Sequence, residues 1–142
     1  MIKSKRGETK MELKERCNFI LMREYDVLDK SLWNMRANLS TKRANRGIHD
    51  SLEQGEFTIN MLMSDIHDVL FSRVGKDLDV YFDAQRKYLQ TLSEEQKNEL
   101  VNAEKEYLKS DGKNDSLKRF LDRTEYIKFN KLLAEKHSGK EL

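Results

Sequence analysis

Residues 21–39 read LMREYDVLDKSLWNMRANL, and their apolar side chains recur at alternating intervals of four and three residues. This is the heptad spacing with which one helix packs lengthwise against another. The stretch therefore predicts a helix with a continuous apolar edge. We call this edge the partner seam and define it by six residues: Leu21, Tyr25, Leu28, Leu32, Met35 and Leu39.

The composition favours helix throughout the chain. None of the 142 residues is proline, the residue that interrupts helices most severely, and 37% are hydrophobic while 37% are charged. Apolar residues at that abundance cover narrow helical stripes instead of broad two-sided layers. We expect a single all-α domain over residues 1–142, a helical bundle of four to five helices with a long N-terminal helix, either alone or paired in a dimer.

The N-terminal helix is predicted to run from about Glu8 to Ala44. Its 37 residues correspond to roughly 55 Å, whereas a compact domain of this size is about 35 to 40 Å across. Two solutions are open. The helix breaks near Asn38–Thr41, where short polar side chains offer the backbone other hydrogen bonds, or its end packs against a second copy of the chain.

Turn residues divide the rest of the chain. Gly47 and Gly55 predict a hinge at about residues 45–56. Gly75 supplies a helix stop, although the apolar stripe also permits one continuous rod across it. Ser93 and Gln96 form a capping box, which predicts a helix start there. The helical remainder, residues 57–137, is thus expected to contain helices over 57–73, over 77–92, from Glu94 through Leu108, and from Ser116 through Leu133.

Several function classes lack their sequence signatures. The single Cys17 excludes an internal disulfide, suits a cytoplasmic location, and lies in an apolar stripe where core packing is the expected role. No run of about 20 apolar residues predicts a membrane span. The three histidines are scattered, and no glycine-rich phosphate loop is present. We therefore expect no enzyme activity, no catalytic residue, no metal, no cofactor, no small-molecule substrate and no membrane partner.

Charge is distributed unevenly along the chain. Residues 1–47, the basic N-terminal third, carry twelve Lys and Arg against six Asp and Glu, whereas residues 48–142 carry fifteen against nineteen. Between residues 30 and 49 there are five cations and no carboxylate. Cations interleaved with Trp, Asn, Ser and Thr are typical of surfaces that contact nucleic acid. The expected phosphate contacts are Lys30, Arg36, Lys42, Arg43 and Arg46.

Two functions follow from these patterns. The first is a small helical protein-interaction module, an adaptor, inhibitor or regulator that docks the partner seam onto a protein partner or onto a second copy. The alternative is a helical nucleic-acid-binding regulator that uses the basic N-terminal third.

Overall fold

The computed structural model describes residues 11–41 and 46–129, with side chains described for residues 11–37 and 54–129. Over these residues the chain is all-α, as predicted, with five α-helices, three short 3₁₀ turns and no strand. The elements in chain order are η1 (Leu13–Glu15), α1 (Asn18–Thr41), α2 (Arg46–Val74), η2 (Gly75–Asp77), α3 (Leu78–Gln90), α4 (Glu94–Lys109), α5 (Ser116–Arg123) and η3 (Tyr126–Lys128).

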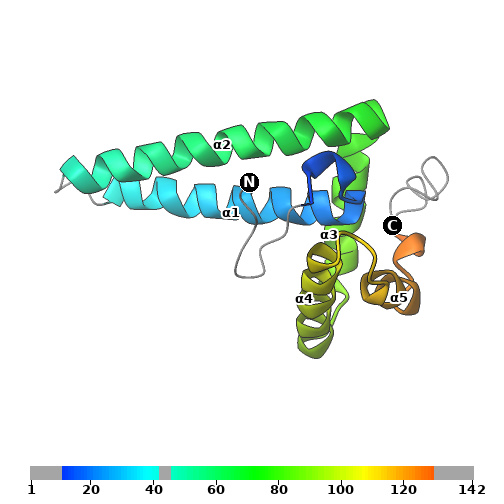
Figure 1. The fold of residues 1–142 in the computed structure, drawn as a ribbon. Helices are drawn as coiled ribbons and strands as arrows, with labels where there is room; N and C mark the ends of the chain where they lie inside the picture. The colour runs from blue at the N-terminus through cyan, green and yellow to red at the C-terminus, as the bar shows by residue number, and fades with distance from the viewer. Residues whose placement is uncertain (1–10, 42–45, 130–142) are drawn as a thin grey trace.

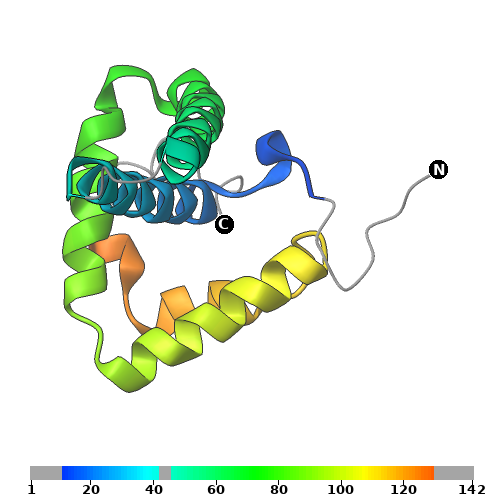
Figure 2. The same ribbon diagram turned by 90° about the vertical axis from the view of Figure 1, so that its left-hand side faces the viewer.

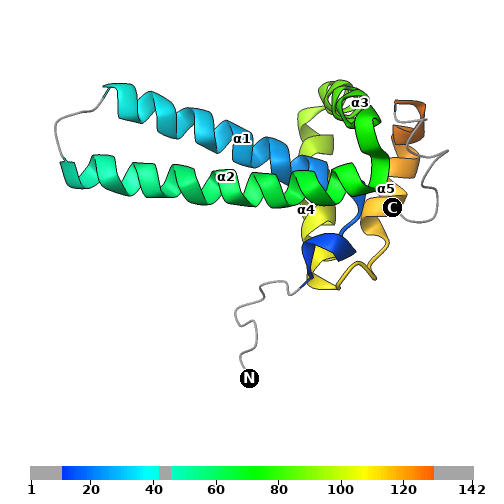
Figure 3. The same cartoon turned by 90° about the horizontal axis from the view of Figure 1, so that it is seen from above.

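α1 and α2 lie side by side as an antiparallel hairpin that projects from the rest of the molecule (Figure 1). We call this hairpin the arm. η1, α3, α4, α5 and η3 form a compact base at the end of the arm where α1 begins and α2 ends. α3 crosses the end of α2, and α4 packs against α5 (Figure 3). A view along the arm shows its two helices end-on, with α4 below them (Figure 2).

The main core lies in the base, where the first turn of α1 is inserted among α3, α4 and α5. Phe19 is fully buried there, and its ring meets that of Tyr126 edge-to-face at 5.2 Å. The buried Gln85 side chain is satisfied on both sides, because its Nε2 donates to the Phe19 carbonyl at 3.0 Å and its Oε1 accepts from the Tyr126 hydroxyl at 2.9 Å. A buried amide with both partners in place fixes α1 against α3 and η3.

Two smaller apolar clusters continue from the base into the arm. One joins α1 to the end of α2 and the start of α3, and it contains Leu21, Met22, Ile66, Leu70, Val74, Leu78, Tyr81 and Phe82. The other lies farther along the arm, and its buried members are Leu32, Ile59 and Met63. Among the described side chains, the cluster farther along the arm has fewer buried members than the cluster next to the base.

The N-terminal helix begins ten residues later than the predicted Glu8, at Asn18. Residues 13–15 form a 3₁₀ turn, and Arg16 then adopts extended backbone angles (φ −80°, ψ 148°). The backbone N–H of Cys17 donates to the Tyr107 hydroxyl at 3.0 Å, so a contact with the base holds the chain outside the helix at this point. α1 ends at Thr41, within the predicted break, and its 24 residues correspond to about 36 Å instead of 55 Å.

The hinge predicted at residues 45–56 is wrong, because residues 46–56 belong to the uninterrupted helix α2. Gly55 has a packing role there. A Cβ at this position would lie 2.9 Å from the Met35 methyl carbon, so the glycine faces α1 and a larger residue would require the end of the Met35 side chain to shift. A helical glycine costs only about 1 kcal/mol relative to alanine, which a helix of 29 residues tolerates. The reversal between α1 and α2 falls at residues 42–45, outside the described residues.

The remaining boundaries follow the turn chemistry more closely. Gly75 has a left-handed φ of +65° and separates α2 from α3, so the two do not form one rod. The capping box at Ser93 is confirmed, with Gln96 N–H donating to Ser93 Oγ at 3.1 Å and Ser93 N–H to Gln96 Oε1 at 2.9 Å. α5 ends early, at Arg123, because Glu125 adopts a left-handed φ of +61°. Leu132 and Leu133 lie outside the described residues.

Candidate functional site

The five described side chains of the partner seam pack against other parts of the chain. Leu21 and Leu32 are buried, while Tyr25, Leu28 and Met35 are half-buried, and all five pack in the clusters that α1 forms with α2. The side chain of Leu39 lies outside the described residues. This corrects the expectation that the seam is an open docking edge. Its heptad spacing reflects the lengthwise packing of α1 on α2, and the second helix comes from the same chain.

The expected phosphate contacts are not gathered on one described surface. Lys30 is exposed on α1, but Arg36 is six residues farther along and therefore about 120° around the helix. Arg36 is also engaged, since its Nε lies 2.6 Å from Glu56 Oε2 and its guanidinium lies over the exposed Trp33 ring at 5.7 Å. Lys42, Arg43 and the side chain of Arg46 lie outside the described residues.

A concave feature lies where the arm meets the base. We call it the junction cleft. It is a cavity of about 360 Å³ with walls from η1, α1, α2 and α4, and seven of its eleven lining residues are apolar. The apolar lining residues are Leu13, Ile20, Val27, Leu28, Leu62, Ile66 and Leu108. Its charged lining residues are Arg16, Arg23, Glu24 and Glu104.

The four charged side chains of the cleft neutralise each other in two ion pairs. Arg16 Nη1 donates to both oxygens of Glu24, at 2.8 and 2.9 Å. Arg23 donates through Nε and Nη2 to the two oxygens of Glu104, at 2.7 and 3.0 Å, and so ties α1 to α4. Hydrogen bonding to Glu104 raises the pKa of Arg23. Because both cations are engaged by carboxylates, the cleft offers an incoming group an apolar and electrically balanced wall.

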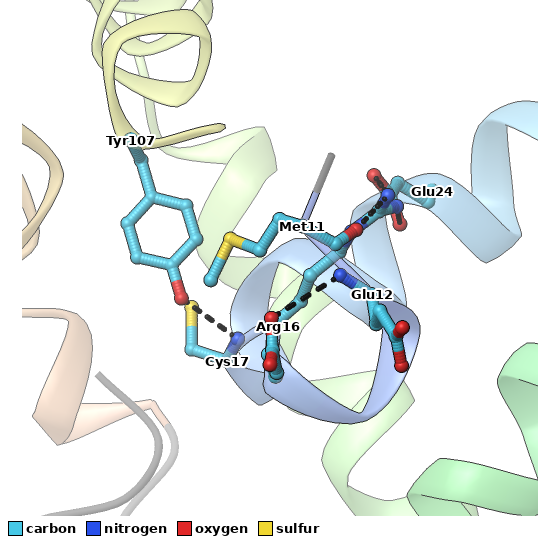
Figure 4. A network of polar contacts seen from close by, with 7 residues as sticks. Met11, Glu12, Arg16, Cys17, Glu24 and Tyr107 are labelled. Carbon is cyan, nitrogen blue, oxygen red and sulfur yellow. Dashed lines mark hydrogen bonds and ion pairs between the residues drawn. The ribbon is translucent and has the colours of Figure 1, made fainter. Parts of the chain in front are cut away.

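Residues 11–17, which we call the strap, form one side of the cleft and are held by polar contacts (Figure 4). Arg73, at the end of α2, donates to the carbonyl oxygens of Lys14 (2.7 Å) and Arg16 (2.8 Å) and to Asn18 Oδ1 (2.7 Å). Arg16 in turn donates to the Met11 carbonyl, at 2.7 and 3.2 Å. Together with the 3₁₀ turn η1, these bonds fix the strap, and Leu13 lies in the cleft wall.

Cys17 closes the strap and lies in the main core, as predicted. Burial is the largest influence on its thiol and raises the pKa. Burial also raises the pKa of Tyr107, whose hydroxyl accepts the Cys17 N–H. A thiol that stays protonated in an apolar environment is a packing residue, in contrast to the exposed thiolates that react.

Within residues 11–41 and 46–129, no group of three His, Cys, Asp or Glu side chains is arranged to hold a metal ion. No helix in this part of the chain has the length and apolar character that crossing a membrane requires.

Comparisons with models of protein families, with curated proteins and with solved structures found no match to this chain.

Proposed function

We propose that this protein is a small helical protein-interaction module, an adaptor, inhibitor or regulator, that binds the apolar face of a helix in the junction cleft. The observation that carries the proposal is the composition of the cleft wall, which is apolar except for two internally paired sets of charges. The proposed interaction surface is therefore the junction cleft and not the partner seam. Val27 and Leu62, which line the cleft, remain exposed.

We expect the cleft to accept apolar side chains that a helix presents one turn apart, because its lining is largely apolar. Amphipathic helices dock in grooves through anchors spaced at i, i+3 or i+4, and i+7. Burying two large apolar anchors contributes about 3–6 kcal/mol before the entropic costs of association. The two ion pairs of the cleft, Arg16–Glu24 and Arg23–Glu104, favour an uncharged anchor residue on the partner helix. A charged anchor would have to compete with these existing bonds for its own partner.

Selection of helical peptides from a display library tests this function. Peptides with an apolar stripe are expected to bind the wild-type chain with little dependence on salt. Leu62→Glu places a charge in the wall at a residue that is 44% exposed, so it should abolish binding without unfolding the chain. Val80→Glu is the matched control, since Val80 is 51% exposed on α3 and does not line the cleft. Failure to select any peptide, or equal binding by Leu62→Glu, would contradict the proposal.

A second candidate function is nucleic-acid binding by the free end of the arm. It is supported by the geometry of the hairpin, in which α1 ends at Thr41 and α2 begins at Arg46 at the end far from the base (Figure 3). Lys42 and Arg43 stand between them in the sequence. Three phosphate contacts would give a slope of log K against log salt of about −2.7 on duplex DNA. Fluorescence anisotropy with a labelled duplex should show this slope for the wild-type chain. The double variant Arg43→Glu with Arg46→Glu should lose both the binding and the slope. Unchanged binding by the double variant would contradict this function.

A further inference from the structure

A row of aromatic rings crosses the arm on the flank away from the junction cleft. We call it the aromatic row, and from α2 across α1 to α3 it consists of Phe71, His67, Tyr25 and Phe82. The centroids of successive rings lie 6.0, 6.4 and 5.1 Å apart. Tyr25 is two residues from Val27 of the cleft and therefore points about 160° away around α1. His67 is five residues from Leu62 and points about 140° away around α2.

One end of the row already holds a cation of the same chain. The Arg86 guanidinium lies 5.0 Å from the centroid of the Phe82 ring. It also donates to both oxygens of Asp26, at 2.8 and 3.1 Å. A ring face and a carboxylate both attract positive charge, so together they form a favourable seat for a guanidinium.

The other end of the row has the same two components, a ring face and a carboxylate. Phe71 is 51% exposed, His67 is exposed and Tyr25 is half-buried. Asp29 follows Tyr25 at i+4 and therefore lies beside it on the surface of α1. In the part of the chain whose side chains are described, no ion pair engages Asp29. This end of the row is thus open to a cation from outside the chain.

The charges around the row are predominantly negative. Burial is the largest influence on the Tyr25 hydroxyl and raises its pKa. Three carboxylates raise it further, those of Asp29, Asp26 and Asp79. Arg86 acts in the opposite direction, but its charge is already paired with Asp26. The surface beside the exposed rings is therefore complementary to positive charge.

We propose that the open end of the aromatic row binds a lysine or arginine side chain from a basic segment of a partner protein. The cation lies over the His67 and Tyr25 rings beside Asp29, which repeats the arrangement of Arg86 on Phe82. This surface is separate from the junction cleft and does not rest on the function proposed for it. An exposed cation–π contact and an exposed ion pair each change affinity only about two- to fivefold, so the segment supplies more than one cation.

Fluorescence anisotropy with a short labelled peptide of alternating arginine and glycine tests this surface. The wild-type chain should bind the peptide, and the affinity should fall as salt is raised, because exposed charges are screened. Asp29→Asn with Phe71→Leu removes one charge and one ring, and should raise Kd about fivefold or more. Asp122→Asn with Phe57→Leu is the matched control, because it removes the same groups from exposed sites on α5 and on the distant part of α2. The two double variants have equal net charge, so a difference between them reports where the peptide binds.

Aromatic NMR signals locate the contact independently. The ring signals of Tyr25, His67 and Phe71 should shift on addition of the peptide, while those of the buried Tyr107 should not. Absence of binding, an equal loss in both double variants, or tighter binding of an acidic or apolar peptide at these rings would overturn the proposal. Leu62→Glu alters the junction cleft and should not weaken binding of the basic peptide, so the two surfaces succeed or fail separately.

Discussion

Replacing Tyr107 by phenylalanine isolates the hydrogen bond that positions the strap. The Tyr107 hydroxyl accepts from the Cys17 N–H at 3.0 Å, and both residues are buried. Tyr107→Phe removes one oxygen and leaves the amide without an acceptor in an apolar site. An unsatisfied buried donor costs about 1–3 kcal/mol. Taking about 2 kcal/mol, and about 3–5 °C of Tm per kcal/mol for a chain of this length, the variant should melt about 6–10 °C below the wild type.

Differential scanning calorimetry at neutral pH measures this loss directly. Tyr25→Phe is the matched control, because it removes the same atom from a half-buried ring on α1 and should change Tm by less than about 2 °C. Equal melting temperatures for Tyr107→Phe and the wild type would show that the strap does not depend on this bond. Amide hydrogen exchange should locate the effect, with faster exchange at Cys17 than elsewhere in the base.

Three further predictions concern the base and the start of α3. Leu117→Ala, at a fully buried side chain, should lower the free energy of unfolding by about 2–5 kcal/mol in urea titrations, and a loss below about 1 kcal/mol would contradict its place in the core. Gly75→Ala should lower the free energy of unfolding by about 1–2 kcal/mol. The whole loss would come from the left-handed φ of +65°, because no atom lies within 4 Å of the added Cβ. An alanine variant more stable than the wild type would contradict the left-handed turn. Burial raises the pKa of Cys17 from its ordinary value of 9.0 and the pKa of Tyr107 from 10.0, so their neutral forms favour the folded state. This stabilisation is complete below the ordinary pKa values and is lost as pH rises toward the folded-state pKa values. The free energy of unfolding should therefore fall above about pH 9. A free energy of unfolding that stays constant up to about pH 10.5 would contradict this prediction.

Local signals in the sequence predicted local structure well. The capping box at Ser93 and Gln96 is confirmed because its two hydrogen bonds join residues three apart and need nothing else from the fold. The heptad spacing from Leu21 to Leu39 likewise predicted a helix that packs lengthwise. It could not identify the second helix, because the same spacing serves an intramolecular neighbour and a second copy equally well.

The errors occurred where distant residues determine the conformation. The start of α1 depends on Tyr107, 90 residues from Cys17 in the sequence. The predicted hinge weighed Gly55 as a turn residue, whereas its contact with Met35 makes it part of a helix pair. The junction cleft was missed because η1, α1, α2 and α4 contribute its wall, and no spacing along the chain records that they meet.

The proposal that the junction cleft is the interaction surface is tested most directly by methyl NMR of the leucine and valine side chains during titration with a selected helical peptide. The account predicts that the perturbed methyl groups are those of Val27, Leu28 and Leu62, with Val80 on α3 and Val101 on α4 unchanged. Perturbations centred on Val80 or Val101, or a spectrum that does not respond to the peptide, would contradict it.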